Sequence, residues 1–360
     1  MNRILIVTPS LVKNDAIGND IFAQQILLRE AGHDVEIFAE NCDSFSRDRV
    51  ISVKTATELV ADPKTLLLYH HSFIWDLGES LFNQAKCRIL FRYHNISPAK
   101  YFDYNNDVMR DLLRGHRQTR RLIQSGKIAG YINDSKFNSV DLVALGADPT
   151  LMEEVAPFNK ITEFNQVEPD PEVKKQIATG QLNVLFVSRI MPHKGQLNLI
   201  RIVDRYVDLY GPEIRLHLVG RVMAATYQKE MIDFVNSRRL GSIVKFHTEV
   251  PFPALSAFYR YSDVFMMTSE HEGFGVPILE AQFHKMPVLL LDRAAVRETA
   301  GPNQLVFPDL DLDRFCAALR VLQQGQEKRR YLGEVGYQNY LQYEAPVLRD
   351  KFLKEISKHF

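Results

Sequence analysis

The sequence predicts an α/β protein made of two Rossmann-like halves, each built around a parallel sheet. Three observations lead to this prediction: a length of 360 residues, short apolar runs that alternate with longer amphipathic stretches, and one irregular stretch near the middle. Hydrophobic residues make up 46% of the chain, enough for two cores. The 44 basic residues balance 44 acidic ones, so net charge gives no reason to expect a nucleic-acid partner.

The first half contains five apolar runs without polar alternation, which is typical of strands buried on both faces of a parallel sheet. They are residues 4–7, 35–39, 65–69, 88–94 and 129–133. Helical patterns lie between them. In the first pattern, residues 20–31, Asp20 is suited to cap the helix and Gly32 to end it. We expect residues 1–160 to form the N-terminal domain.

The stretch 156–175 holds three prolines and no clear period, which predicts a linker. Five further apolar runs follow: residues 183–188, 215–220, 244–247, 263–269 and 287–292. We expect residues 161–335 to form the C-terminal domain. Residues 336–360 have a helical pattern, and we expect this helix to pack back on the N-terminal domain.

The three cysteines, Cys42, Cys87 and Cys316, are odd in number and far apart, so they fit neither a disulfide framework nor a zinc site. No run approaches the ~20 apolar residues of a membrane span. The apolar start of the chain is better explained as a first strand than as a signal peptide, because Pro9 and Ser10 interrupt it. We therefore expect a cytoplasmic protein.

The loop "EHEGFGVPILEA" (270–281) follows the predicted strand 263–269, and open α/β sheets bind ligands at the carboxyl ends of their strands. Pro277 suits the first position of a helix, which places Glu280 in its first or second turn. There the helix dipole favours an ionised carboxylate that accepts from two neighbouring hydroxyls, such as those of a ribose. Glu272 stands at the strand end, and the glycines let backbone N–H groups approach a bound polar group. A glycine-rich turn with two solvated acids is the alternative.

A second group of residues follows the strand in "NVLFVSRIMPHKG" (183–195). Arg189 and Lys194 lie at the strand's carboxyl end, where two cations can neutralise a diphosphate and stabilise it as a leaving group. Solvation at the surface is the alternative for either residue alone. Both groups fall in the same half of the chain.

"SRIMPHKG", followed some 80 residues later by "SEHEGFGVPILEA", resembles the retaining glycosyltransferases of family four. These enzymes have the GT-B fold, in which two Rossmann-like domains face each other across a deep cleft. The resemblance implies that the C-terminal domain binds a GDP- or UDP-linked sugar. The N-terminal domain would bind a glycan or lipid-linked acceptor whose hydroxyl receives the hexose, as in polysaccharide biosynthesis.

The resemblance also implies a role for each matching residue. The catalytic positions are Arg189, Lys194, Glu272 and His94. The donor-binding positions are Gly18, Arg221, Glu249, Val250, Gly273, Phe274, Gly275 and Glu280. Arg189 and Lys194 match the diphosphate ligands, Glu280 the ribose ligand and Glu272 a contact of the transferred sugar. Neither a metal nor another cofactor is implied, because Arg and Lys carry the charge that Mg²⁺ carries elsewhere.

Several of these positions depart from the family pattern or allow a second interpretation. Gly18, in a loop expected at 14–20, stands where relatives have a Gly-Gly pair, and Arg221 could be a solvated surface arginine. His94, which ends "RYH", faces the donor sugar in relatives but could be structural. His70 or His71, which also end a predicted strand, could face the same site.

Three further expectations complete the functional prediction. His193 and His271 adjoin site residues and are expected to be solvated. No carboxylate nucleophile is evident, so we expect same-face attack in which the departing diphosphate deprotonates the acceptor. The alternatives are a nucleotide-sugar 2-epimerase of the same architecture and an inactive binding subunit.

The stretch "MRDLLRGHRQTRRLIQSGK" (109–127) combines five arginines with several apolar residues. It could lie on an anionic bilayer as a peripheral membrane contact. The preferred interpretation is an amphipathic helix with its apolar side on the sheet and its arginines in water.

Overall fold

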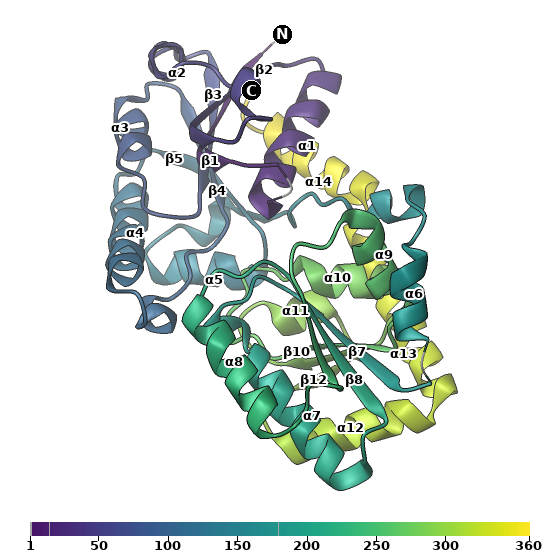
Figure 1. Cartoon of the computed structure of the whole chain (residues 1–360). Coiled ribbons are helices and arrows are strands. Elements are labelled where there is room, and N and C mark those ends of the chain that lie inside the picture. Colours follow the sequence, from purple (N-terminus) through teal and green to yellow (C-terminus); the bar gives the residue numbers. More distant parts are fainter. Residues whose placement is uncertain (1, 14, 179) are drawn as a thin grey trace. The chain divides into compact units, whose positions relative to one another are not determined.

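The computed structural model describes residues 2–13, 15–178 and 180–360 and divides the chain into two compact units (Figure 1). Unit 1 consists of the chain up to Asn159 together with Tyr343–Phe360, and unit 2 is Lys160–Gln342. Each unit contains a six-stranded sheet in which neighbouring strands are parallel. The predicted α/β class with two Rossmann-like sheets is therefore confirmed.

The sheet of unit 1 has the strand order β2–β1–β3–β4–β5–β6. Its strands are β1 Arg3–Leu11, β2 Asp34–Cys42, β3 Thr65–His71, β4 Arg88–Tyr93, β5 Ile128–Asn133 and β6 Met152–Glu154. The helices of this unit are α1 Ala16–Glu30, α2 Val53–Val60, α3 Asp76–Gln84, α4 Asn106–Gln124, α5 Lys136–Ala144 and α14 Ala345–Ser357. The order reverses between β1 and β3, which is where a sheet of this kind leaves a crevice at its carboxyl edge.

The two faces of this sheet are covered by different helices. In Figure 1, α3 and α4 lie on one side, and α1 and α14 lie on the other. Strand β3 is buried at every position, so its side chains alternate between two covered faces. His70 accordingly contacts Gln24 of α1, and His71 contacts Thr119 of α4.

Helix α1 begins earlier than the sequence suggests. Asp15 caps it by accepting from the N–H of Ile17, whereas Asp20, the expected cap, lies inside the helix and is fully buried. Asp20 is occupied by tertiary partners, described below, which a local capping rule does not detect. The helix ends as predicted, with Gly32 in a left-handed conformation just beyond it.

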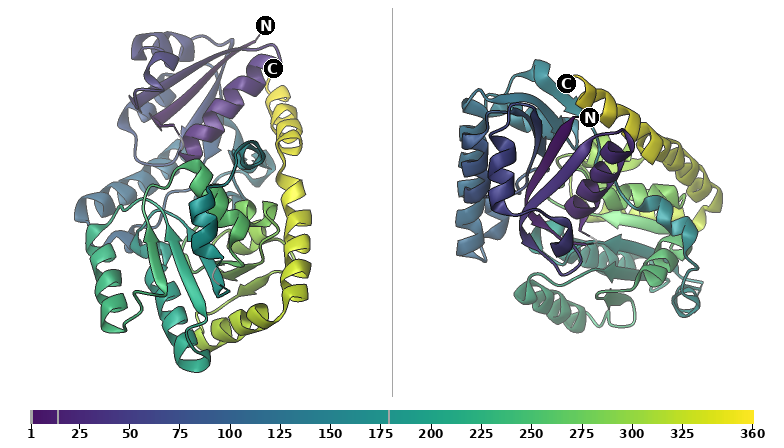
Figure 2. Two further views of the ribbon diagram at one scale, coloured as in Figure 1. Left: turned by 45° about the vertical axis from the view of Figure 1, so that its right-hand side comes forward. Right: turned by 90° about the horizontal axis from the view of Figure 1, so that it is seen from above.

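Residues 336–360 were expected as a single helix, but they hold the end of α13, a short 3-10 turn and α14. Helix α14 belongs to unit 1, where it runs beside α1 (Figure 2). Phe352 of α14 meets Phe158 edge to face, and Phe360 stacks on His33 just after α1. Aromatic pairs of this kind contribute about 0.5–1.5 kcal/mol each beyond the area they bury.

The sheet of unit 2 has the strand order β12–β11–β10–β7–β8–β9, that of a dinucleotide-binding fold, and it reverses between β7 and β10. Its strands are β7 Leu182–Val187, β8 Ile214–Val219, β9 Val244–His247, β10 Val264–Met267, β11 Val288–Leu291 and β12 Leu305–Phe307. The helices are α6 Pro171–Ile177, α7 Gln196–Tyr210, α8 Ala225–Ser237, α9 Phe252–Tyr261, α10 Val276–Phe283, α11 Val296–Ala300, α12 Leu312–Gln324 and α13 Gln326–Tyr340.

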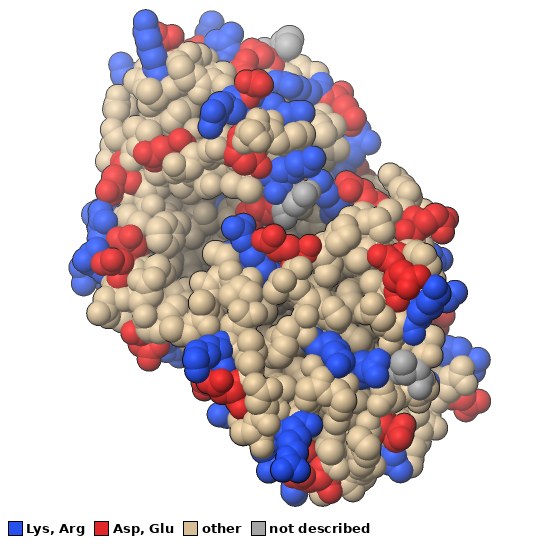
Figure 3. All heavy atoms as spheres, in the orientation of Figure 1, with Lys and Arg blue, Asp and Glu red and all other residues tan. Residues whose placement is uncertain are grey.

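Two features complete the description of the surface. On the face drawn in Figure 3, basic and acidic side chains are interspersed, in keeping with their equal numbers. Among the described residues, no helix has both the length and the apolar character needed to cross a bilayer.

Candidate active site

The predicted diphosphate ligands of unit 2 follow β7, at the point where the strand order reverses. Arg189 is the second residue after the strand, and its side chain is exposed. It forms no ion pair with any residue in the described ranges. Lys194 ends a short 3-10 turn, and Gly195 then starts α7 in a left-handed conformation, with φ of 72°. A Cβ at Gly195 would lie 2.2 Å from the carbonyl oxygen of Thr268, so only glycine lets this loop pack against the end of β10.

Lys194 and Glu272 are brought together from the ends of β7 and β10. The Lys194 Nζ atom donates to both carboxylate oxygens of Glu272, at 2.9 and 2.8 Å. Both side chains are mostly covered, with 12% and 13% exposed. Burial alone would raise the pKa of Glu272. The charge and hydrogen bond of Lys194, together with a hydrogen bond from Ser269, have the larger effect and lower this pKa below its usual value. Glu272 is therefore an ionised acceptor.

The loop between Glu272 and α10 has the backbone that its glycines suggest. Gly275 is left-handed, with φ of 101°, and stands directly before α10. The carbonyl of Phe274 accepts from Thr299, and the Phe274 ring is buried. These contacts fix the loop at the N-terminus of α10, where free backbone N–H groups favour an anionic or hydroxyl ligand.

Glu280 lies in the second turn of α10 and accepts a hydrogen bond from the hydroxyl of Tyr259 on α9. Burial raises the pKa of Glu280 to about 7, and the hydrogen bond offsets only part of this rise. Burial thus opposes the helix dipole, which was expected to favour the ionised carboxylate and which acts mainly on the first turn. Near neutral pH, the protonated and ionised forms of Glu280 are therefore both populated.

The remaining donor-binding candidates of unit 2 lie on more exposed loops. Arg221 follows β8, and its Nε atom is 3.3 Å from a carboxylate oxygen of Glu249, which follows β9. Their side chains are 71% and 68% exposed, so the pair contributes little to stability. Val250 is half-buried beside Glu249. A ligand at this edge of the sheet would meet both charges.

Two histidines adjoin Lys194 and Glu272 in the sequence. We expected both to be solvated, but the structure buries them. His193 is 5% exposed and His271 is 9% exposed. Burial and the positive charge of Lys194 lower the pKa of His193 to about 3, so His193 is neutral. Their sequence positions in glycine-containing loops give no sign of this packing.

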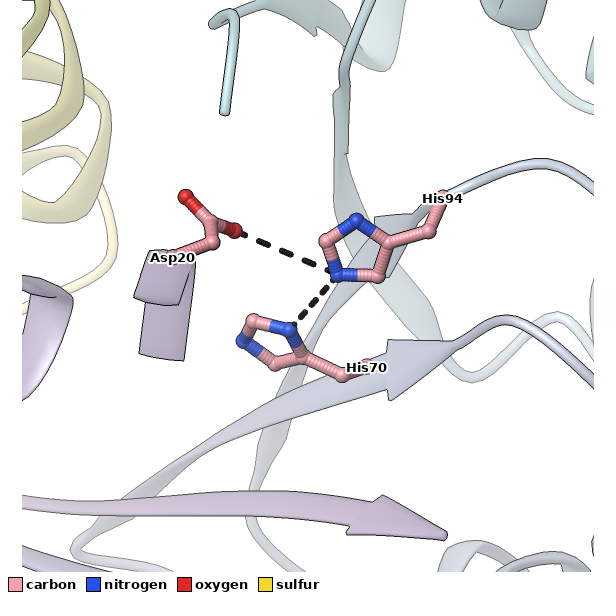
Figure 4. Close-up of side chains that lie close together, drawn as sticks. All are labelled: Asp20, His70 and His94. Carbon is pink, nitrogen blue, oxygen red and sulfur yellow. Dashed lines mark hydrogen bonds and ion pairs between the residues drawn. The ribbon is translucent and has the colours of Figure 1, made fainter. Parts of the chain in front are cut away.

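In unit 1, His94 follows β4 and lies among side chains from the ends of neighbouring strands (Figure 4). Its Nε2 atom is 2.8 Å from Nδ1 of His70, and its Nδ1 atom is 3.0 Å from a carboxylate oxygen of Asp134. Asp20 of α1 lies 4.0 Å from His94 Nε2. Sequence reasoning selected His94 and left His70 open, but it missed Asp20 and Asp134, although an aspartate directly after a strand was a usable signal.

The spacing of Asp20, His70 and His94 alone would admit a metal, since one ligand atom from each lies within 4.8 Å of the others. However, two nitrogens on one tetrahedral zinc ion are separated by about 3.3 Å, given Zn–N bonds near 2.05 Å. The 2.8 Å between the histidine nitrogens is a hydrogen-bond distance. We therefore describe these residues as a hydrogen-bonded network.

Gly18 was expected in a loop at residues 14–20, but it lies in α1, which begins at Ala16. Asn14, the first residue of the expected loop, lies outside the described residues. A Cβ at Gly18 would lie 2.1 Å from the carbonyl oxygen of Val12. The first turn of α1 thus packs directly on the backbone after β1. A glycine at this position is explained by packing.

Residues 168–339 match the family described as Glycosyl transferases group 1. A D-inositol 3-phosphate glycosyltransferase of Kribbella flavida is 29% identical over 212 residues, which cover 55% of this chain and 49% of that protein. An amylovoran biosynthesis glycosyltransferase of Erwinia amylovora is 24% identical over 202 residues, which cover 55% and 53%. The chain thus spans about half the length of these curated relatives.

Among solved structures, HepE of Anabaena in complex with UDP and glucose superposes with a TM-score of 0.75 at 17% sequence identity, covering 99% of this chain and 100% of that one. This likeness establishes the fold. The family match thus covers just under half of this chain, and the shared fold is that of the GT-B glycosyltransferases. The resemblance predicted from the two sequence motifs, to a glycosyltransferase of the GT-B fold, is confirmed.

Proposed function

We propose that this protein is a retaining glycosyltransferase that moves a hexose from a UDP- or GDP-linked donor to a hydroxyl of a glycan or glycolipid in polysaccharide biosynthesis. Unit 2 would bind the donor and unit 1 the acceptor. The observation that carries the proposal is the placement of Arg189, Lys194 and Glu272 at the carboxyl ends of β7 and β10, where the sheet order reverses. This is the edge at which such sheets bind nucleotides.

The chemistry follows from the charges at this edge. Arg189 and Lys194 would neutralise the diphosphate and stabilise it as it departs, without requiring a metal. Glu272 would accept from a hydroxyl of the transferred sugar, and Glu280 from the ribose. The departing phosphate oxygen would take the proton of the attacking hydroxyl on the same face of the sugar, which accounts for retention.

Two comparisons support the choice of donor and pathway. HepE was solved with UDP and glucose, and the Erwinia relative is named for the biosynthesis of amylovoran. The three cysteines are unpaired in the structure, which is compatible with the cytoplasmic location expected from the sequence.

The first test is thermal unfolding in EDTA with UDP, GDP, ADP and their hexose conjugates. A nucleotide at 100 times its Kd should add ~2.7 kcal/mol of stability. We expect UDP or GDP and its sugar conjugate to raise Tm by several degrees and ADP to have no effect. The Arg189→Ala variant is the matched control, since it should unfold normally and show a much smaller shift. No shift with either nucleotide would contradict the proposed donor.

Product analysis then separates transfer from the alternative reaction. We expect the chosen donor to be consumed only when an acceptor glycan is present, with the anomeric configuration kept in the product. A change in the donor sugar without any acceptor would identify a 2-epimerase instead.

The basic helix α4 is the candidate for membrane contact, and the structure weakens that hypothesis. Three of its arginines, Arg110, Arg114 and Arg121, pair with carboxylates of unit 1, and its apolar residues Leu112 and Leu122 are buried. We expect no flotation with anionic liposomes at physiological salt, because the paired carboxylates offset the attraction of these arginines to anionic lipid, which is about 1 kcal/mol per charge. Salt-sensitive flotation that is lost in an Arg117→Glu/Arg120→Glu variant would restore the membrane hypothesis.

A further inference from the structure

Six buried side chains of unit 1 form a closed ring of hydrogen bonds and ion pairs around His94. The ring consists of Asp134, His94, His70, Gln24, Asp20 and Arg92. They come from α1, from β3 and β4, and from the residues that follow β4 and β5, so the ring lies along the carboxyl edge of three neighbouring strands and the helix beside them. Arg92 and Asp20 have no exposed side-chain surface.

The direction of each hydrogen bond can be deduced by starting from the carboxylate of Asp20, which can only accept. Gln24 Nε2 donates to Asp20 at 2.7 Å, so the Gln24 amide orientation is fixed. Its oxygen then faces His70 Nε2 at 3.1 Å, and that nitrogen must carry a proton. In a neutral His70, the other nitrogen, Nδ1, is an acceptor.

Both nitrogens of His94 face acceptors, so both must act as donors. Nε2 lies 2.8 Å from the accepting nitrogen of His70 and must donate to it. Nδ1 lies 3.0 Å from the carboxylate of Asp134, which also only accepts. With His70 neutral, this arrangement requires a proton on each nitrogen of His94. Its positive charge balances the ring, since Arg92 supplies one positive charge against the two carboxylates.

The shared proton could in principle belong to His70, leaving His94 neutral. Three facts place it on His94. His94 contacts Asp134 directly and lies 4.0 Å from Asp20, whereas the hydrogen bonds of His70 within the described part of the chain go to the uncharged Gln24 and to His94. Burial, together with the charges of His94 and Arg92, lowers the pKa of His70 well below its usual value. Burial raises the pKa of Asp134, but the charges of a protonated His94 and of Arg92 hold it below its usual value, so an imidazolium at His94 and an ionised Asp134 stabilise each other.

We infer that His94 is held as an imidazolium and that His70 and Asp134 are the positioning residues that keep it so. The inference deepens the proposed function, on which its catalytic meaning rests. A doubly protonated His94 cannot take a proton from an acceptor hydroxyl. Both of its N–H groups are engaged by His70 and Asp134, so what it offers the proposed acceptor site of unit 1 is positive charge, which leaves the departing diphosphate as the base.

The decisive measurement is the ring ¹⁵N spectrum of the full-length protein labelled on its 11 histidines. Signals are assigned with His94→Gln and His70→Asn. At pH 8, we expect the signals of two protonated nitrogens for His94. For His70, we expect one protonated and one unprotonated nitrogen. A single protonated nitrogen on His94 at pH 8 would overturn the inference, whatever the activity assay shows.

Variants of His70 then test whether this residue keeps His94 protonated or only fills space in the core. In His70→Asn, the amide oxygen can replace the accepting Nδ1, so we expect His94 to keep both protons. In His70→Leu, the acceptor is lost, and part of His94 should be deprotonated at pH 8. The matched control is His71→Leu, which removes a buried histidine from the opposite face of β3 and should leave the His94 signals unchanged.

Activity gives an independent readout. We expect kcat of His70→Leu to fall further below wild type as pH rises from 6 to 8, with His70→Asn largely restoring it. If kcat of His70→Leu instead rises as His94 loses its proton, His94 acts as a base and the inference is wrong. If the spectrum shows the imidazolium but no sugar is transferred, the ring stands and the proposed function fails.

Discussion

Replacing Arg189 by alanine is expected to lower kcat by about 10²–10³-fold, the usual cost of removing one preorganised donor from a developing negative charge. The folded state should be as stable as wild type, because the Arg189 side chain is exposed and has no ion-pair partner among the described residues. Steady-state kinetics and thermal unfolding on the same preparation would test both statements. Unchanged kcat would show that Arg189 does not contact the leaving group.

Lys194→Ala should have a similar effect on kcat and an additional effect on stability. It leaves Glu272 mostly buried without its partner, which we expect to cost about 1–3 kcal/mol of folding free energy. The control is Lys194→Ala/Glu272→Ala, which removes both charges and should recover most of the lost stability but no activity. Equal stability of the single and double variants would mean that the ion pair does not support the fold.

The second large effect is expected at Glu280, where function and stability should change in opposite directions. The raised pKa means that the native state binds a proton between the ordinary value of 4.5 and about 7, whereas the unfolded chain does not. Stability should therefore fall as pH rises through this window, and the full cost is present above pH 7. The shift corresponds to up to about 3 kcal/mol.

Glu280→Gln keeps the shape of the side chain and removes its charge. We expect this variant to unfold at a higher temperature than wild type at pH 8, with the difference disappearing below about pH 4.5. The affinity for the nucleotide should fall, because a neutral amide is a weaker acceptor for ribose hydroxyls than a carboxylate. Melting curves at pH 5 and pH 8 provide the test, with Glu249→Gln as an exposed glutamate control. A pH-independent difference would show that Glu280 does not titrate in this window.

The sequence was most informative where a strand end and a charged residue coincide. Arg189, Lys194 and Glu272 were selected because they follow apolar runs, and the structure brings Lys194 and Glu272 together because their strands, β7 and β10, are neighbours. The short edge strands β6 and β12 were missed, since three residues are too few to show a period.

What the sequence could not show depends on distant partners. Asp20 has the composition and position of a helix cap, and nothing near it indicates that Arg92, 72 residues away, will bury it. The pKa of Glu280 likewise depends on how deeply the side chain is buried and on its hydrogen bond with Tyr259, more than on its position in the helix. A charged residue inside an apolar run, such as Arg92 in "RILFRYH", is the one local sign that a buried partner exists.

The division of the chain has a consequence for the order in which the protein is made. Unit 2 is continuous, from Lys160 to Gln342, whereas unit 1 needs both the first part of the chain and α14. During synthesis from the N-terminus, all of unit 2 emerges from the ribosome before the helix that covers Phe158 does. The domain that is translated first is thus the last to be completed, and until α14 has been made Phe158 lacks the aromatic partner that it has in the folded protein.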